Sequence, residues 1–230
     1  MGRTVAFIDA GYLEAEGKKA LKAAHGEHSI DAAGVAEWIK GEVKKRFPTD
    51  QEAFLRAYWY TAAFDPSDDR FDAQRGFHGA VESVPGIQLR LGRLVQRDPN
   101  WHVAVKAALV KCGVDLVTFG EHYEFRPYLT QKGVDSLIVL DVVRFAERRV
   151  YDWGILIAGD RDLAEAVQVA QDTGARFIVA YPKGAGMAPE LRHLADELVQ
   201  IEPHELKNMF RKRKVKPDES GEPLEVVRTD

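Results

Sequence analysis

The sequence predicts an α/β protein with a mostly parallel sheet and helices on both faces. Short apolar runs typical of buried strands alternate with segments of roughly 10–15 residues whose apolar positions recur at helical spacing. Two of the apolar runs, at residues 4–8 and 153–159, lead directly into an aspartate. The chain has 230 residues, 45% of them hydrophobic, which is enough for one domain of ordinary to large size.

Each element of the N-terminal half has a local cause. Residues 4–8 are a short apolar run and predict a strand. From 31 to 47 apolar residues recur at helical spacing until a proline stops the pattern. Residues 54–63 are rich in aromatic side chains, which favours a strand. A helix is expected at 70–84, ended by a Pro-Gly pair, and the alternating residues 87–95 predict a further strand.

The C-terminal half continues the alternation. A helix is expected at 131–149, a buried strand at 155–158, and a helix at 163–173 that Gly174 closes. A strand, a helix and a last strand follow, at residues 175–180, 189–195 and 198–201. Right-handed crossovers between such strands give a mostly parallel sheet.

Two segments fall outside this pattern. The stretch 101–130 is harder to interpret, and a hairpin insertion that turns at Gly120 is expected near 115–130. Residues 211–230 are charged and lack apolar periodicity, which predicts a disordered tail. The globular domain is therefore expected to span 1–205.

The composition excludes several classes of protein. A single cysteine, Cys112, excludes an internal disulfide framework and a cysteine-rich zinc site. No apolar run approaches the roughly 20 residues that cross a bilayer. No signal peptide is expected either, which favours a cytoplasmic location. The net charge of −4 argues against polyanion binding by the whole surface, but it leaves room for a local basic groove.

Four aspartates are candidate ligands of a divalent metal ion. Asp9 and Asp160 follow apolar strands, Asp162 lies two residues further on, and Asp135 opens the helix expected at 131–149. Carboxylates at the carboxyl ends of parallel strands converge on one crevice. Two unit charges about 4 Å apart repel by about 4 kcal/mol at an effective dielectric constant near 20. A hard cation such as Mg²⁺, which takes oxygen ligands, relieves that repulsion.

Structural roles compete with metal binding at these positions. Asp9 also suits a turn or helix cap. Asp162 and Glu165 fit a capping box at the start of the next helix, whereas Asp160 has no such alternative.

Helical geometry singles out two acids of the helix expected at 131–149. Asp135 shares an apolar face with Val139 and Val142, where a carboxylate needs a partner, either a metal ion or Lys132. Asp141 falls at the border of that face and is expected to support a ligand or cap a helix rather than bind the metal.

The order of these motifs resembles the NYN domain, the branch of the PIN-like nuclease superfamily that includes the LabA-like bacterial proteins. The resemblance covers residues 4–201 and rests on three blocks: Phe7-Ile8-Asp9-Ala10-Gly11-Tyr12, Gln131-Lys132-Gly133-Val134-Asp135 with Asp141, and Ala158-Gly159-Asp160-Arg161-Asp162-Leu163. It implies a Rossmann-like three-layer α/β/α sandwich and a metal-dependent nuclease that usually acts on RNA.

The resemblance also assigns the site. The family's catalytic and metal-binding acids map onto Asp9, Asp135, Asp160 and Asp162. Three positions depart from the family pattern: Tyr12 stands where an Asn is common, Ala158 where a Ser is common, and Leu163 where an aromatic residue is common. These changes leave fewer polar groups to orient water or phosphate.

The expected reaction is hydrolysis of phosphodiester bonds. One or two Mg²⁺ or Mn²⁺ ions held by the aspartates would activate a water and stabilise charge on the phosphate. Lys132 is expected to contact phosphate or to tune Asp135. Positive charge at the rim would come from Arg90, Arg93 and Arg97, although a solvated strand face is the commoner role of such arginines.

A catalytically weak module that binds RNA or another protein is the alternative function. Its metal site would be vestigial, and the 115–130 region and the basic start of the tail would dock onto a partner. RNA is the expected partner of the enzyme. Single-stranded nucleic acid in general and a homodimer remain open, and no membrane partner is expected.

Overall fold

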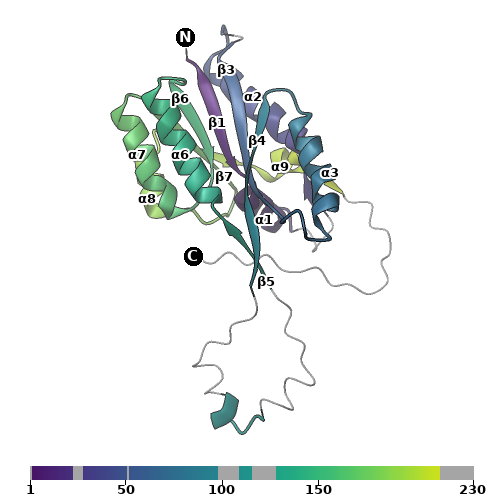
Figure 1. Cartoon of the computed structure of the whole chain (residues 1–230). Helices are drawn as coiled ribbons and strands as arrows, with labels where there is room; N and C mark the ends of the chain where they lie inside the picture. Colours follow the sequence, from purple (N-terminus) through teal and green to yellow (C-terminus); the bar gives the residue numbers. More distant parts are fainter. Residues whose placement is uncertain (1, 23–27, 51, 98–108, 116–127, 213–230) are drawn as a thin grey trace.

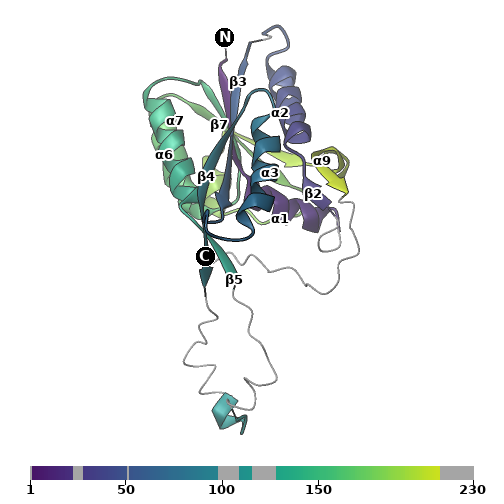
Figure 2. The same cartoon turned by 45° about the vertical axis from the view of Figure 1, so that its right-hand side comes forward.

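The computed structural model describes residues 2–22, 28–50, 52–97, 109–115 and 128–212, which form one main sheet with helices on both faces (Figures 1 and 2). The strands of the main sheet are β1 Thr4–Asp9, β3 Phe54–Ala63, β4 Ile87–Arg97, β5 Tyr128–Lys132, β6 Trp153–Ile157, β7 Arg176–Pro182 and β8 Glu197–Ile201. The main helices are α1 Ala10–Ala20, α2 Ala32–Arg46, α3 Phe71–Glu82, α6 Val134–Glu147, α7 Ala164–Asp172, α8 Pro189–Leu194 and α9 Pro203–Met209. None of the helices in these ranges is long and apolar enough to cross a bilayer.

The topology of the main sheet confirms the predicted α/β class. Its spatial order is β5-β4-β3-β1-β6-β7-β8, and every neighbouring pair is parallel except β4 and β5. The chain starts in the middle with β1, adds β3 and β4 on one side, and later adds β6, β7 and β8 on the other. The order therefore reverses between β1 and β6, and such a reversal is where open α/β sheets bind ligands.

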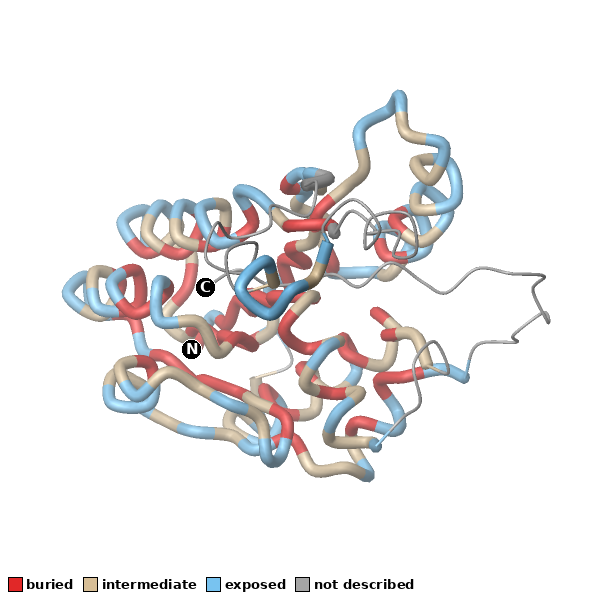
Figure 3. The backbone as a smooth tube through the Cα atoms, turned by 90° about the horizontal axis from the view of Figure 1, so that it is seen from below, coloured by how far each residue is buried: buried red, intermediate tan, exposed pale blue. Residues whose placement is uncertain are grey.

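The helices form two layers, as expected of a Rossmann-like, PIN-like sandwich. Helices α6, α7 and α8 cover one face, and α1, α2, α3 and α9 cover the other (Figure 1). Successive residues of each strand point to opposite faces, so Phe7 packs under α6 while Ile8 packs with Leu13 of α1. The buried backbone follows the strands and the inner sides of the helices (Figure 3).

The last described residues, 210–212, are held against α1 and α2. Strand β9 Phe210–Lys212 pairs antiparallel with β2 His28–Ile30. Phe210 is buried, and its ring packs on Gly17: a Cβ atom at position 17 would lie only 2.6 Å from the ring. The tail predicted from residue 211 therefore begins within a strand. Residues 213–230 and most of the hairpin predicted at 115–130 lie outside the described residues.

The structure differs from the secondary structure predicted from the sequence in three places. Helix α1 follows Asp9 directly, whereas the sequence pattern predicts only a short exit from the strand. The sequence also gives no sign of α9 or of the β2–β9 pair. Helix α6 begins at Val134 rather than 131, because β5 occupies the preceding residues and Gly133, with φ of 79°, makes the turn between them.

Candidate functional site

The candidate site lies at the carboxyl edge of the sheet, where β1 and β6 run side by side. Ile8 pairs with Ile157, so the residues that follow them leave the sheet next to one another. Asp9 is the last residue of β1, and Asp160 lies three residues after Ile157 as the N-cap residue of the turn η1 Arg161–Leu163. Strand β5 runs antiparallel to the others and returns the chain to this edge, where α6 begins and contacts η1. The topology thus brings the start of α6 to the ends of β1 and β6.

Asp9 is buried and caps α1. Only 2% of the residue is exposed, and its Oδ1 accepts a hydrogen bond from the Tyr12 backbone N–H at 2.9 Å. It lies two residues after Phe7, on the face of β1 that packs against α6 and α7. The capping role that the sequence leaves open for Asp9 is therefore present, with the carboxylate on the α6 side of the sheet.

The capping role that the sequence predicts for Asp162 belongs to Asp160. Asp160 Oδ1 accepts from the Asp162 backbone N–H at 3.0 Å and so caps η1, while Asp162 is exposed. The predicted capping box of Asp162 with Glu165 is wrong. The 3₁₀ turn separates Asp162 from α7, whose N-cap residue is Leu163 and has no side-chain cap. Asp160 is half-buried at the mouth of the site.

Asp135 is exposed, which corrects the expectation that it lies on a buried face. Val142 is buried and Val139 is partly buried on the same side of α6, so the predicted helical face is right. Asp135 sits in the first turn of α6, next to the buried Val134, which packs over Gly92 of β4. The start of α6 contacts η1, so Asp135 belongs to an element that borders the turn of Asp160.

Asp141 is the buried acid of α6. Its Oδ2 accepts from the Tyr60 O–H at 3.0 Å and from Arg90 Nε at 3.0 Å, and only 7% of the residue is exposed. The guanidinium of Arg90 also lies over the Tyr58 ring, 4.8 Å from its centroid. Burial, together with the neighbouring Asp141 charge, raises the pKa of Tyr60. Asp141 therefore supports the α6–β3–β4 packing and caps no helix, and Arg90 is engaged there rather than at the rim.

Two other basic residues predicted for phosphate contact are exposed. Lys132 lies opposite Arg93 in the β4–β5 register, so both side chains point to the same face of this strand pair. Arg93 pairs with Ala63, the last residue of β3, next to the β3–α3 loop. The pKa of Asp65 in that loop is lowered mainly by hydrogen bonds from Ser67, with a smaller contribution from Arg93. The side chain of Arg97 lies outside the described part of the structure.

The donor set at this edge suits a hard, hydrated cation. Within the described residues, no group of three or more His, Cys, Asp or Glu side chains is arranged to hold a metal ion. Mg²⁺ in proteins takes one or two carboxylates and keeps several waters. Asp9, at the end of β1, and Asp160, in the turn after the neighbouring strand β6, match that requirement in ligand type and number. The residues therefore fit a hydrated Mg²⁺ or Mn²⁺ ion rather than a closed metal cage.

Tyr12 is a site residue that the sequence alone does not identify; there it stands out only because the resembling family commonly has an Asn at this position. Its O–H donates to the Gly186 carbonyl at 3.0 Å, and its ring lies against Gly159. The available signal is its position, three residues after Asp9, where the resemblance places a functional Asn.

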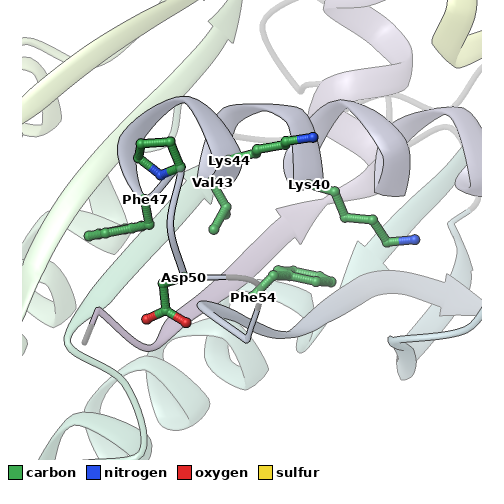
Figure 4. A pocket seen from close by; sticks show the side chains of 7 residues that line it. Lys40, Val43, Lys44, Phe47, Asp50 and Phe54 are labelled. Atoms are coloured by element: carbon green, nitrogen blue, oxygen red, sulfur yellow. The ribbon is translucent and has the colours of Figure 1, made fainter.

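One described cavity is remote from these acids. It has a volume of about 370 Å³ and lies between the end of α2 and the start of β3, at the opposite edge of the sheet (Figure 4). Its lining residues are Lys40, Val43, Lys44, Phe47, Pro48, Asp50 and Phe54. None of the acids discussed above lines this cavity, so it is not part of the candidate site.

Comparison with known proteins gives one family and two curated relatives. The model of the NYN domain matches residues 3–202. The "Low amplitude and bright protein LabA" of Synechococcus elongatus is 26% identical over 147 residues, which cover 64% of this chain and 62% of that protein. The uncharacterized protein y4oD of Sinorhizobium fredii is 41% identical over 68 residues, 29% of this chain and 32% of that protein. The matched part of this chain thus covers about a third of the length of the y4oD protein and less than two thirds of the length of the LabA protein.

A solved structure shares the fold. The crystal structure of a protein of unknown function from Vibrio parahaemolyticus superposes with a TM-score of 0.51 and covers 87% of this chain and 93% of its own. At 18% sequence identity the likeness concerns the fold alone.

Proposed function

This chain belongs to the NYN domain family, which is nuclease-like, and on that premise we propose that it is a metal-dependent nuclease that hydrolyses phosphodiester bonds, with RNA as its substrate. The observation that carries the proposal is the convergence of three elements, β1, η1 and α6, at the reversal of strand order. Each of the three brings an aspartate to that edge: Asp9, Asp160 and Asp135.

The four aspartates would have two different roles in binding the metal ion. Asp9 and Asp160 would hold Mg²⁺ or Mn²⁺, and the exposed Asp135 and Asp162 would reach it directly or through bound water. When bound, such an ion lowers the pKa of a water molecule and stabilises negative charge on a phosphate oxygen. The backbone N–H groups of Tyr12 and Asp162 each donate to one of the first two carboxylates, which keeps one oxygen of each in a fixed direction.

The adjacent β4–β5 pair supplies positive charge for the substrate. Lys132 and Arg93 are exposed and lie on the face of the β4–β5 ribbon opposite Arg90 and α6, where the ribbon extends past the site edge (Figure 2), so they would contact the substrate beside the acids. Like charges opposite each other destabilise a strand pair, and a bound phosphate offsets that repulsion. Such contacts position a nucleic-acid backbone without reading its sequence.

Cleavage assays test the proposal. Labelled single- and double-stranded RNA and DNA are incubated with the wild-type protein, with and without Mn²⁺. We expect cleavage of RNA that requires the metal and is lost in Asp160→Asn. Asp172→Asn is the matched control, because Asp172 is an exposed aspartate at the far end of α7. Cleavage that persists in Asp160→Asn, or that is lost equally in Asp172→Asn, would contradict the assignment.

A module that binds RNA or protein without turnover is the second candidate. It is favoured by the engagement of Asp9 and Asp160 as caps of α1 and η1, which gives both carboxylates a structural role. RNA binding that survives chelation, without cleavage under any metal condition, would support it.

A further inference from the structure

Tyr12 contacts both Asp9 and the residue that precedes Asp160. The residue is buried, with 4% of its surface exposed. Its backbone N–H donates to Asp9 Oδ1 at 2.9 Å, and its side chain crosses to the exit of β6, where Asp160 follows. One residue of α1 thus links the two neighbouring strand ends.

The contact with β6 is made at Gly159. A Cβ atom at Gly159 would lie 2.4 Å from Tyr12 Cε2 and 2.8 Å from the Gly186 carbonyl oxygen, so only glycine leaves room for the ring and the loop. The Gly159 carbonyl accepts from the Ala188 backbone N–H at 2.9 Å. The backbone immediately before Asp160 is therefore in contact with the Tyr12 ring, with Gly186 and with Ala188.

The Tyr12 hydroxyl adds a hydrogen bond to these contacts. It donates to the Gly186 carbonyl at 3.0 Å, across 174 residues of sequence. The loop that carries Gly186 and Ala188 is thereby fixed to α1 as well as to Gly159. An asparagine at position 12 has no ring to cover Gly159 and is shorter than tyrosine, so the contact depends on the residue that departs from the family pattern.

We infer that Tyr12 is a positioning residue that holds the Gly159–Asp160 backbone at a set distance from Asp9, and so sets the spacing of the two carboxylates for a divalent ion. The part about the ion rests on the proposed function. The claim that Tyr12 positions Asp160 does not depend on that function, because the contacts of Tyr12 with Gly159 and Gly186 are present without a metal ion. The side chain of Tyr12 acts through its contacts with Gly159 and Gly186.

The test uses the full-length protein and its Tyr12→Phe variant. This change keeps the ring over Gly159 and removes only the hydroxyl that ties the loop. Tyr151→Phe is the matched control, since the buried Tyr151 O–H also donates to a backbone carbonyl, that of Val142, at 3.0 Å, in the core beneath α6. Two readouts are compared in both variants: amide hydrogen exchange without metal, and Mn²⁺ affinity by calorimetry without substrate.

We expect Tyr12→Phe to speed exchange at the Ala188 and Asp162 amides, which report the loop and the Asp160 cap. Mn²⁺ affinity should fall about tenfold, the lower end of the effect of removing a group that orients a metal ligand. Tyr151→Phe should leave both readouts unchanged even if its melting temperature falls. In RNA cleavage, Tyr12→Phe should lower kcat more than it raises KM.

Two results separate the inference from the proposed function. If Tyr12→Phe exchanges at Ala188 and Asp162 as slowly as wild type and binds Mn²⁺ equally well, Tyr12 only packs and the inference is wrong, whereas the nuclease proposal stands. If wild type neither binds Mn²⁺ nor cleaves RNA, the proposed function fails. The exchange comparison then still decides whether Tyr12 positions Asp160.

Discussion

Arg90 and Asp141 form an ion pair between β4 and α6, with Nε and Oδ2 3.0 Å apart. Tyr60 of β3 donates to the same oxygen, so one carboxylate joins two strands to the helix above them. Fifty-one residues separate the two partners in sequence. The pair fixes α6 across the sheet and thereby places the first turn of α6, with Asp135, at the site edge.

Asp141→Asn should destabilise the fold. It leaves the Arg90 charge without its counter-ion, although the amide oxygen can still accept from Tyr60. We expect a loss of about 2 kcal/mol, below the roughly 3–5 kcal/mol for a fully buried pair, because a third of the Arg90 side chain (33%) is exposed. Urea unfolding measures the change, and Glu147→Gln, an exposed acid of the same helix, is the control. An equal loss in both variants would show that the pair contributes nothing specific.

Divalent metal should stabilise the protein. An ion that binds only the folded state adds about 2.7 kcal/mol when its concentration is 100 times the dissociation constant. For a domain of this size, that raises the melting temperature by about 5–10 °C. Thermal unfolding with and without Mn²⁺ measures the shift, which Asp160→Asn should reduce. No shift in wild type, or the same shift in the variant, would be evidence against a site shared by the aspartates.

Asp135→Asn should abolish cleavage without affecting the fold. The exposed position makes the change a surface substitution, so we expect stability to stay within about 0.5 kcal/mol of wild type. Cleavage rate, Mn²⁺ affinity and melting temperature are measured together. A marked loss of stability with unchanged metal affinity would instead support pairing of Asp135 with Lys132.

The sequence predicts elements well where the local pattern decides them. The strand expected at 54–63 is found at Phe54–Ala63, because an aromatic run of that length has few alternatives to a strand in a sheet. Helix α1 is hidden because its buried residues are few and include Gly17. Its stability depends on the Asp9 cap and on packing that no local pattern encodes.

For the site residues too, local sequence predicts some features, whereas others depend on tertiary packing. Periodicity gives the correct helical face for Asp135 but not its exposure, because burial also depends on which tertiary neighbours cover each turn of the helix. An Asp-x-x-Glu spacing suggests a cap at Asp162, yet a 3₁₀ turn intervenes and Asp160 is the cap. The partner of Asp141 follows only from strand order, which places β4 beneath α6.

His78 should make stability depend on pH. Burial lowers the pKa of His78 below its usual 6.5, although the charge of Glu82 acts in the opposite direction. Its Nε2 has no hydrogen-bond partner among the described residues. A histidine with a lowered folded pKa contributes stability above pH 6.5, and this is lost as the pH falls through the folded value.

Replacement by an apolar residue tests this contribution. Between pH 7 and pH 5, roughly the range in which histidines titrate, wild type should lose stability relative to His78→Leu. Urea unfolding at several pH values measures the difference, and the exposed His193→Gln is the control. Parallel pH profiles for wild type and His78→Leu would show that His78 does not titrate on unfolding.

The boundary of the C-terminal tail should lie after β9. Phe210 is 5% exposed and packs on Gly17, so Phe210→Ala should cost about 3 kcal/mol or more. Deletion of residues 213–230 should leave the melting temperature nearly unchanged, because that sequence has too little apolar surface to offset the entropy of ordering it.

The same deletion should weaken binding of long RNA at low salt, because it removes Arg213 and Lys214 and the counter-ion release that they contribute. The difference between full-length and shortened chains should shrink as salt is raised. Binding assays over a salt series and thermal unfolding are run on both chains. A large fall in melting temperature on deletion would instead show that the tail docks on the domain.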